Sequence, residues 1–383
     1  RIADTYGPLV YHQLGETPRV YGQQEAYTRF FADLDEGQQL IREYLDEGGD
    51  NNKFKEYDML TNGKTLKEWL KFANSLRLRL AMRISNVDAT LAKDQATKAL
   101  NDNQGVLEGA RETIAVMGKN YINPLCAVAG WGEVYMNASM ESIVNGYEDP
   151  RGKKWYNTAL LEGYQKQLLG IPIGLPMKDG DANIYSFCSS LNTSTIGEKT
   201  GAVLMSAAEV WLLRAEAALR GYTKENPRTC YEYGVSTSFT QWDCAGASEY
   251  LESDKTPADY KDVVSGGKVG KDMKALITIS PKWEEDADIE TKLEKIITQK
   301  WLACWPESYE AWAEQRRTGY PKLFKVQNNT GKVIDTDIMI RRLPFSTDAA
   351  TADPAQYATL TEKLGGADNG ATRLWWDTGK NSF

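Results

Sequence analysis

The sequence has almost no histidine and little cysteine, which narrows the chemistry open to it. His12 is the only histidine among 383 residues, and the five cysteines form no Cys-x-x-Cys pair. A zinc site needs several such ligands at short spacing, and a nucleophilic enzyme needs a general base beside its nucleophile. No Gly-x-Ser-x-Gly elbow is present either. We therefore expect no metal, no cofactor and no enzymatic activity.

The cysteines are too sparse to indicate a disulfide framework. An odd number without regular spacing is typical of buried free thiols, which is the state we expect. One disulfide between Cys230 and Cys244 is the alternative that the sequence leaves open. The full set is Cys126, Cys188, Cys230, Cys244 and Cys304.

Long apolar runs and basic clusters are also missing. No run approaches the ~20 apolar residues needed to cross a bilayer. Acidic residues outnumber basic ones by 53 to 45, giving a net charge of -8, which argues against nucleic acid or anionic lipid as the main partner. The first eleven residues show no charged-then-apolar signal pattern, so we expect the chain to begin within the mature protein.

Aromatic residues, in contrast, are abundant. The chain has 42% hydrophobic residues, enough for a real core, and length alone allows one large or two medium domains. Eleven Trp and twenty Tyr exceed what such a core needs. Most of these rings are expected to pack helices, and the remainder suggest a contact surface for a ligand.

Apolar residues recur at steps of three and four in several segments, which predicts amphipathic helices. Thr65 and Glu68 form a capping-box pattern at the start of one of them. Pro306 separates the last two, because proline cannot continue a helix. The predicted helices cover about 23–47, 65–86, 89–101, 205–221, 291–304 and 308–317.

Long segments rich in Gly, Pro, Asn and Asp lie between these helices, and their pattern predicts neither helix nor strand. We predict an all-α, single-domain fold over 1–383, in which helix pairs form a scaffold and irregular loops project from it. The scaffold covers about 23–101, 205–240 and 291–321. The loop-rich insertions cover about 111–199, 250–288 and 325–383.

Five segments, in this order over most of the chain, resemble the SusD/RagB family of outer-membrane nutrient-binding lipoproteins. They are WLKFANSLRLRLAMRIS at 69–85, DPR at 149–151, EVWLLRAEAALRG at 209–221, YEYGVSTSF at 231–239, and ITQKW at 297–301 leading to EAWAEQRRTGYP at 310–321 and RRLP at 341–344. Any one of them could arise by chance, whereas all five together are a specific indication.

The resemblance implies a superhelical scaffold of tetratricopeptide-like helix pairs and a non-catalytic role at the cell surface. In that family the protein is anchored in the outer membrane by a lipid on an N-terminal cysteine and covers a SusC-like TonB-dependent transporter. Its ligand is a glycan or, in RagB-like members, a peptide. The signal peptide, the lipidated cysteine and the earliest helices of the family are absent from this sequence.

The charged residues of the motifs are expected to be structural. Arg77, Arg79 and Arg83 on one helix and Glu209 and Glu216 on another have the signs and the spacing for buried ion pairs. Buried charges of this kind hold helices in register and depend on one another. Ligand contacts are expected from the loops instead.

A sugar ring offers an apolar face and a rim of hydroxyls, so its binding site needs flat aromatic rings beside amides. Clusters of these residue types give the candidate contacts, and we favour Trp131, Tyr135 and Tyr185 because their segments have the weakest helical pattern. The alternative is that each ring packs the scaffold. The candidates are Trp131, Tyr135, Asn137, Trp155, Tyr156, Asn183, Tyr185 and Trp242.

Two other functions are weighed against glycan capture. Peptide capture would use backbone pairing and charged pockets, and the aromatic surplus disfavours it. A helical glycoside hydrolase needs two carboxylates across a cleft. Glu310 and Glu314 are one helical turn apart within a motif, which favours a solvated or ion-paired role for both.

Overall fold

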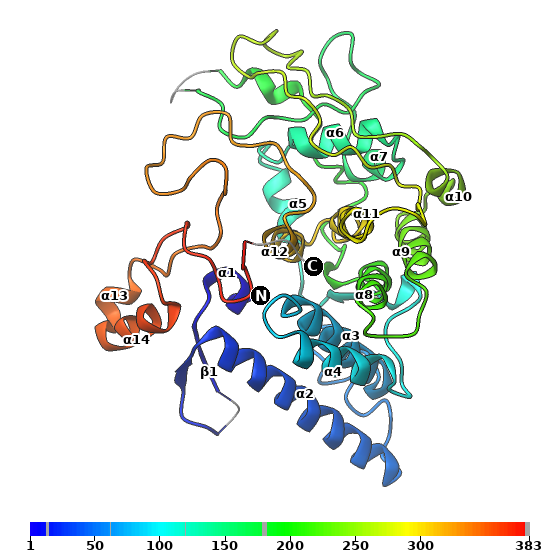
Figure 1. The fold of residues 1–383 in the computed structure, drawn as a ribbon, viewed down its shortest axis with the longest axis vertical. Coiled ribbons are helices and arrows are strands. Elements are labelled where there is room, and N and C mark those ends of the chain that lie inside the picture. The colour runs from blue at the N-terminus through cyan, green and yellow to red at the C-terminus, as the bar shows by residue number, and fades with distance from the viewer. Residues whose placement is uncertain (13–14, 62, 119, 178–181, 380–383) are drawn as a thin grey trace.

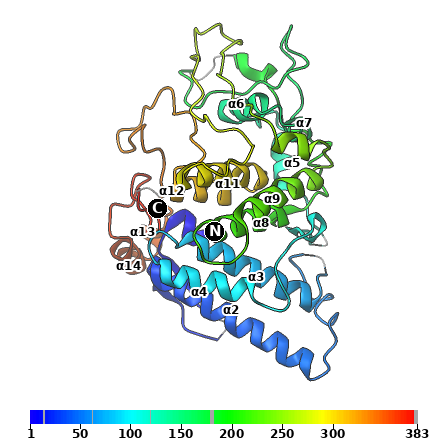
Figure 2. The same cartoon turned by 45° about the vertical axis from the view of Figure 1, so that its right-hand side comes forward.

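The computed structural model describes residues 1–12, 15–61, 63–118, 120–177 and 182–379. Seven helices form the scaffold, and they confirm the predicted all-α class and the predicted helical segments (Figure 1). They are α2 (Gln23–Asp46), α3 (Leu66–Arg83), α4 (Ala89–Leu100), α8 (Ala207–Leu219), α9 (Pro227–Gln241), α11 (Ile289–Ala303) and α12 (Ser308–Thr318). These helices are stacked in layers, from α2 at one end to α11 and α12 further along the molecule (Figure 2).

The other elements are short. One small antiparallel strand pair joins neighbouring segments, β1 (Leu9–Tyr11) with β2 (Arg19–Tyr21). The other ties distant segments together, β3 (Ile114–Val116) with β4 (Ala202–Met205). The remaining helices are α1 (Ile2–Tyr6), α5 (Pro124–Ala129), α6 (Ala138–Gly146), α7 (Arg151–Trp155), α10 (Ala247–Leu251), α13 (Ala349–Ala352) and α14 (Pro354–Leu364), with the 3-10 turns η1 (Ala110–Glu112) and η2 (Ile184–Phe187). Of these helices, α5, α6, α7 and α10 lie in the upper half of Figure 1, and α1, α13 and α14 lie at its left.

Local caps explain where several scaffold helices begin. The Thr65 hydroxyl accepts a hydrogen bond from the backbone N–H of Glu68, and the Glu68 carboxylate accepts one from the backbone N–H of Thr65, which confirms the predicted capping box. The Ser206 hydroxyl caps α8 in the same way by accepting from the backbone N–H of Glu209. Left-handed Gly319 ends α12.

The largest hydrophobic core lies between α6, α8, α9 and α11, so it joins the scaffold to the loop-rich segments. α8 and α9 approach each other closely at Gly234. A Cβ atom at that position would lie 2.6 Å from the Cγ atom of Leu212. Only glycine allows the two helices this spacing.

A second, charged core lies among α3, α8, α11 and α12. Arg79 donates to Glu209 at 2.7 and 2.6 Å, as predicted. Arg83 instead donates to Glu310 at 2.7 Å and also pairs with Glu314. Arg79 therefore meets a predicted carboxylate, whereas Arg83 is paired by two carboxylates of α12.

Two further pairings also differ from the prediction. Glu216 binds Arg317 of α12 at 2.6 Å rather than an arginine of α3. Arg77 donates to Asp35 of α2 at 2.5 Å, because its position on α3 faces α2. Burial alone would raise the pKa of Glu310, but its cationic neighbours, with Arg83 first among them, outweigh burial and lower it.

The cysteines and the other absences can be reported for the described part of the chain. All five cysteines are free, which confirms the thiol interpretation over the Cys230–Cys244 disulfide. Within the described ranges, no helix is long and apolar enough to span a bilayer. No group of three or more potential metal-ligating side chains occurs there either.

Candidate functional site

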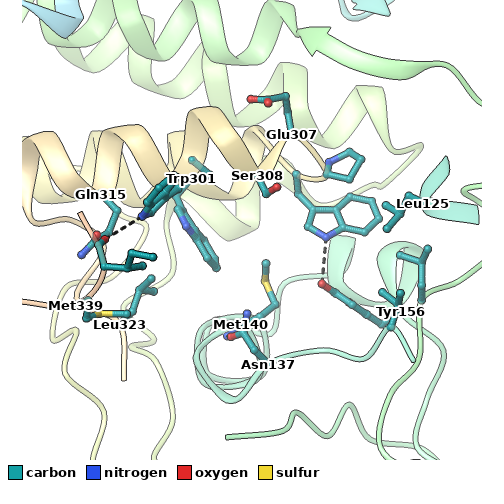
Figure 3. A pocket seen from close by; sticks show the side chains of 17 residues that line it. Leu125, Asn137, Met140, Tyr156, Trp301, Glu307, Ser308, Gln315, Leu323 and Met339 are labelled. Atoms are coloured by element: carbon teal, nitrogen blue, oxygen red, sulfur yellow. Dashed lines mark hydrogen bonds between the residues drawn. The ribbon is translucent and has the colours of Figure 1, made fainter. Parts of the chain in front are cut away.

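A pocket of about 360 Å³ lies where the turn between α11 and α12 meets the segments around α5, α6 and α7 (Figure 3). Glu307 and Ser308 lie across it from Met140, Asn137 and Tyr156. Apolar and aromatic side chains dominate its wall. The lining residues are Leu125, Val134, Asn137, Met140, Tyr156, Leu191, Trp301, Trp305, Pro306, Glu307, Ser308, Ala311, Trp312, Gln315, Leu323, Met339 and Ile340.

Trp305 is the centre of an aromatic cluster behind this pocket. Its ring stacks on Trp155 with centroids 5.1 Å apart and planes at 21°. Trp242, the C-cap of α9, meets the same ring edge-on at 5.2 Å. Tyr156 lies at 5.8 Å and accepts a hydrogen bond from Trp305 Nε1 at 3.1 Å, drawn as a dashed line in Figure 3. Four rings thus fix the wall rigidly.

Two amides provide free hydrogen-bonding groups at the pocket. Asn137 caps α6, and its Oδ1 accepts from the backbone N–H of Met140 at 2.8 Å. No group in the described part of the chain hydrogen-bonds the Asn137 Nδ2 atom or the side-chain amide of Gln315. A ligand with hydroxyl or amide groups could therefore bind both without displacing a protein contact.

Glu307 is the only carboxylate among the described lining residues, and it already has partners. It accepts from the backbone N–H of Glu310 at 2.8 Å and pairs with Arg1 at 3.1 Å. Burial raises its pKa, and Arg1 partly opposes this. A hydrolase would need a second carboxylate opposite Glu307. The lining is suited to binding a neutral, amphipathic ligand.

The hydroxyl of the pocket tyrosine is a hydrogen-bonding group and not a base near neutral pH. Burial raises the pKa of Tyr156 to about 12, so its hydroxyl stays protonated. The predicted ion-paired role of Glu310 and Glu314 is confirmed, because both are buried among arginines and Lys300.

The structure brings four of the sequence-derived candidates together. Asn137 and Tyr156 line the pocket, while Trp155 and Trp242 support Trp305 from behind. Trp155 is fully buried, so its ring acts through Trp305 and presents no surface to a ligand.

The other four candidates lie outside the pocket. Trp131 follows α5 and is 70% exposed, while Tyr135 is half-buried and pairs with the backbone at Ser190. Asn183 is exposed and caps η2. Tyr185, one of the three favoured candidates, is buried because its hydroxyl donates to Asp262 at 3.1 Å and accepts from the Gly270 N–H at 3.0 Å. Its role in this structure is to hold two loops together.

Sequence reasoning missed the pocket residues of α11 and α12. Trp301, Trp305, Trp312 and Gln315 lie in or beside motif segments, where helical periodicity predicts packing. The indication that could have found them is the spacing of the three tryptophans, which places Trp301 one turn before Trp305 and places Trp312 six residues beyond Pro306. Rings so placed converge when the two helices form a hairpin.

Comparisons with known proteins agree with the fold. The family model described as SusD-like, "Susd and RagB outer membrane lipoprotein", matches residues 1–377. A SusD homologue from Bacteroides vulgatus is 56% identical, with a TM-score of 0.95 over 100% of this chain and 77% of that chain. A chitin-binding SusD homologue from Flavobacterium johnsoniae is 35% identical, with a TM-score of 0.92 over 100% and 79%. A SusD-like protein from Bacteroides thetaiotaomicron is 32% identical, with a TM-score of 0.89 over 98% and 78%. The search of curated proteins found no match.

Proposed function

Because the chain belongs to the SusD-like family of outer-membrane lipoproteins, we propose that it captures a glycan at the cell surface and passes it to a SusC-like TonB-dependent transporter. On this proposal the chain acts as one non-catalytic domain. It is held at the outer membrane by the lipid anchor that the family description implies. The observation that carries the proposal is the rigid aromatic pocket with unpartnered amides.

The wall of the pocket has the composition that a sugar requires. Trp301 and Trp312 offer aromatic faces to the apolar side of a pyranose, and Gln315 and Asn137 offer amides to its hydroxyls. The relative from Flavobacterium johnsoniae is described as chitin-binding, which supports a glycan as the ligand class. We propose exposed Trp131 as a further contact outside the pocket, because α5, which it follows, supplies Leu125 to the lining.

A panel of polysaccharides in native affinity gels tests the proposal, with chitin, cellulose, xylan, mannan, starch and pectin as the probes. The wild-type chain should be retarded by at least one of them. Trp301→Ala should weaken that binding about tenfold, which corresponds to roughly 1.4 kcal/mol. Tyr57→Ala is the matched control, because Tyr57 is exposed and lies outside the pocket.

Two further arms separate the alternatives. Calorimetry with a tryptic peptide digest should show no heat of binding, and binding there without any glycan binding would assign peptide capture instead. Incubation of the retained polysaccharide with the protein should release no new reducing ends. Co-purification from outer membranes should recover the transporter barrel with this chain, and its absence would refute the delivery step.

A further inference from the structure

An exposed aromatic stack lies on α8 and α9, and none of its rings lines the pocket. The ring of Tyr233 packs against Trp211 with centroids 4.8 Å apart and planes at 33°. The guanidinium of Arg214 lies over the ring of Trp211, 3.7 Å from its centroid. The three side chains form a layered stack, called here the α8–α9 platform, and Tyr233 remains 53% exposed.

The two layers beneath Tyr233 are fixed from behind. Trp211 Nε1 donates to the backbone carbonyl of Glu108 at 3.0 Å. Arg214 donates to the Glu108 carboxylate at 2.7 Å and to Glu225 at 3.0 Å. The close approach of α8 and α9 at Gly234 sets the spacing of the two rings. The support beneath the Tyr233 ring is therefore held in place before a ligand binds.

On its own helix, Tyr233 is flanked by polar groups without net charge. Thr229 and Thr237 lie four residues to either side of it, on the same face of α9. Arg228 and Glu232 neutralise each other through a hydrogen bond of 2.7 Å. The hydroxyl of Tyr233 has no hydrogen-bond partner among the residues that the structure describes. An aromatic face flanked by two threonine hydroxyls fits a neutral pyranose better than an ion or a charged peptide.

We propose that the α8–α9 platform is an accessory carbohydrate-binding site that stacks one sugar ring of a long glycan on Tyr233. This rests on the proposed function, since it takes the same class of ligand. It is separate from the pocket, because no residue of the stack lines it. A polymer gains from a second contact by effective concentration, whereas a short oligosaccharide held in the pocket does not.

The experiment compares Tyr233→Ala with Tyr233→Trp, with Trp301→Ala in the pocket and with the control Tyr57→Ala. Retention on the same six polysaccharides is measured, together with calorimetry on a tetrasaccharide of each. Tyr233→Ala should bind the retained polymer three- to tenfold more weakly and its tetrasaccharide unchanged. Tyr233→Trp should keep polymer binding, because it keeps an aromatic face. Unchanged thermal melting would show that both variants fold.

The outcomes distinguish the two proposals. If Tyr233→Ala binds every retained polymer as the wild type does while Trp301→Ala is weakened, the platform is overturned and the pocket stands. If only Tyr233→Ala is weakened, the platform stands and the pocket is overturned. If the wild type binds none of the six polysaccharides, both proposals are overturned. Equal loss of polymer and tetrasaccharide binding in Tyr233→Ala would also overturn an accessory role.

Discussion

We expect the buried carboxyl of Glu141 to make the stability of this protein fall as the pH rises. Glu141 lies on α6, is 8% exposed, and accepts a hydrogen bond from the Gly170 N–H at 2.5 Å. Burial raises the pKa of this carboxyl from 4.5 to about 8, and the Gly170 N–H opposes burial only in part. Burial likewise raises the pKa of nearby Cys188 to about 12, and Glu141 adds to that shift. Among the residues that the structure describes, no cation forms an ion pair with the Glu141 carboxylate, unlike the carboxylates of the charged core.

The sign follows from proton binding in the two states. Between pH 4.5 and about pH 8 the unfolded chain has lost the proton of Glu141 and the folded chain has kept it. The contribution to stability is therefore fully present below pH 4.5 and is lost as the pH rises through about 8. A span of about 3.5 pH units, at about 1.4 kcal/mol for each, sets an upper limit of roughly 5 kcal/mol.

Glu141→Gln removes the titration and keeps an oxygen that can accept from Gly170. Urea unfolding of both proteins at pH 5, 6, 7 and 8 should show the variant gaining on the wild type by up to roughly 1.4 kcal/mol for each pH unit. Glu133→Gln, at an exposed glutamate, is the control and should show no such trend. A difference between Glu141→Gln and wild type that stays constant from pH 5 to 8 would refute the reasoning.

Three further substitutions test the packing. Glu314→Ala leaves buried cations without their carboxylate partner and should lower the free energy of unfolding by about 3–5 kcal/mol. A melting temperature within one degree of the wild type would contradict this. Gly234→Ala pushes a methyl group against Leu212 and should lower the free energy of unfolding, measured in urea, by about 1–3 kcal/mol. Gly37→Ala on α2 is the control: it has open space around it and should be neutral or stabilising by up to about 1 kcal/mol. Ser206→Ala removes the cap of α8 and should cost about 1 kcal/mol, with Ser206→Thr retaining most of it if the hydroxyl is responsible.

The scaffold helices could be predicted because local sequence patterns determine where each of them forms. The apolar stripe and the capping box predict a helix over 65–86, and α3 runs from Leu66 to Arg83. The prediction over 89–101 matches α4, which ends at Leu100. α14 was missed inside a segment expected to be irregular, although Asp353, Pro354 and Gly365 are ordinary start and stop residues for it.

The partners of the motif charges needed the structure. Residue signs and helical spacing predict that the arginines of α3 are paired, but not which carboxylate each one meets. Arg83 and Glu314 are 231 residues apart in the chain, and only the packing of α12 on α3 joins them. Local patterns fix which side of a helix is charged, whereas the pairing is set by the tertiary arrangement.

The candidate ligand-contact residues show the same limit more clearly. The sequence does not show whether an aromatic residue is buried in the core or exposed to solvent. Trp155 and Trp131 were both candidates, with Trp131 favoured, and the structure buries Trp155 fully and leaves Trp131 70% exposed. What separates them is Trp305, which covers the ring of Trp155 from 150 positions further along the chain. A ring reaches a ligand only if no distant element covers it. Residues on a rigid helix hairpin with one face left open, such as Trp301 and Trp312, are therefore better candidates than rings chosen for the irregularity of their own segment.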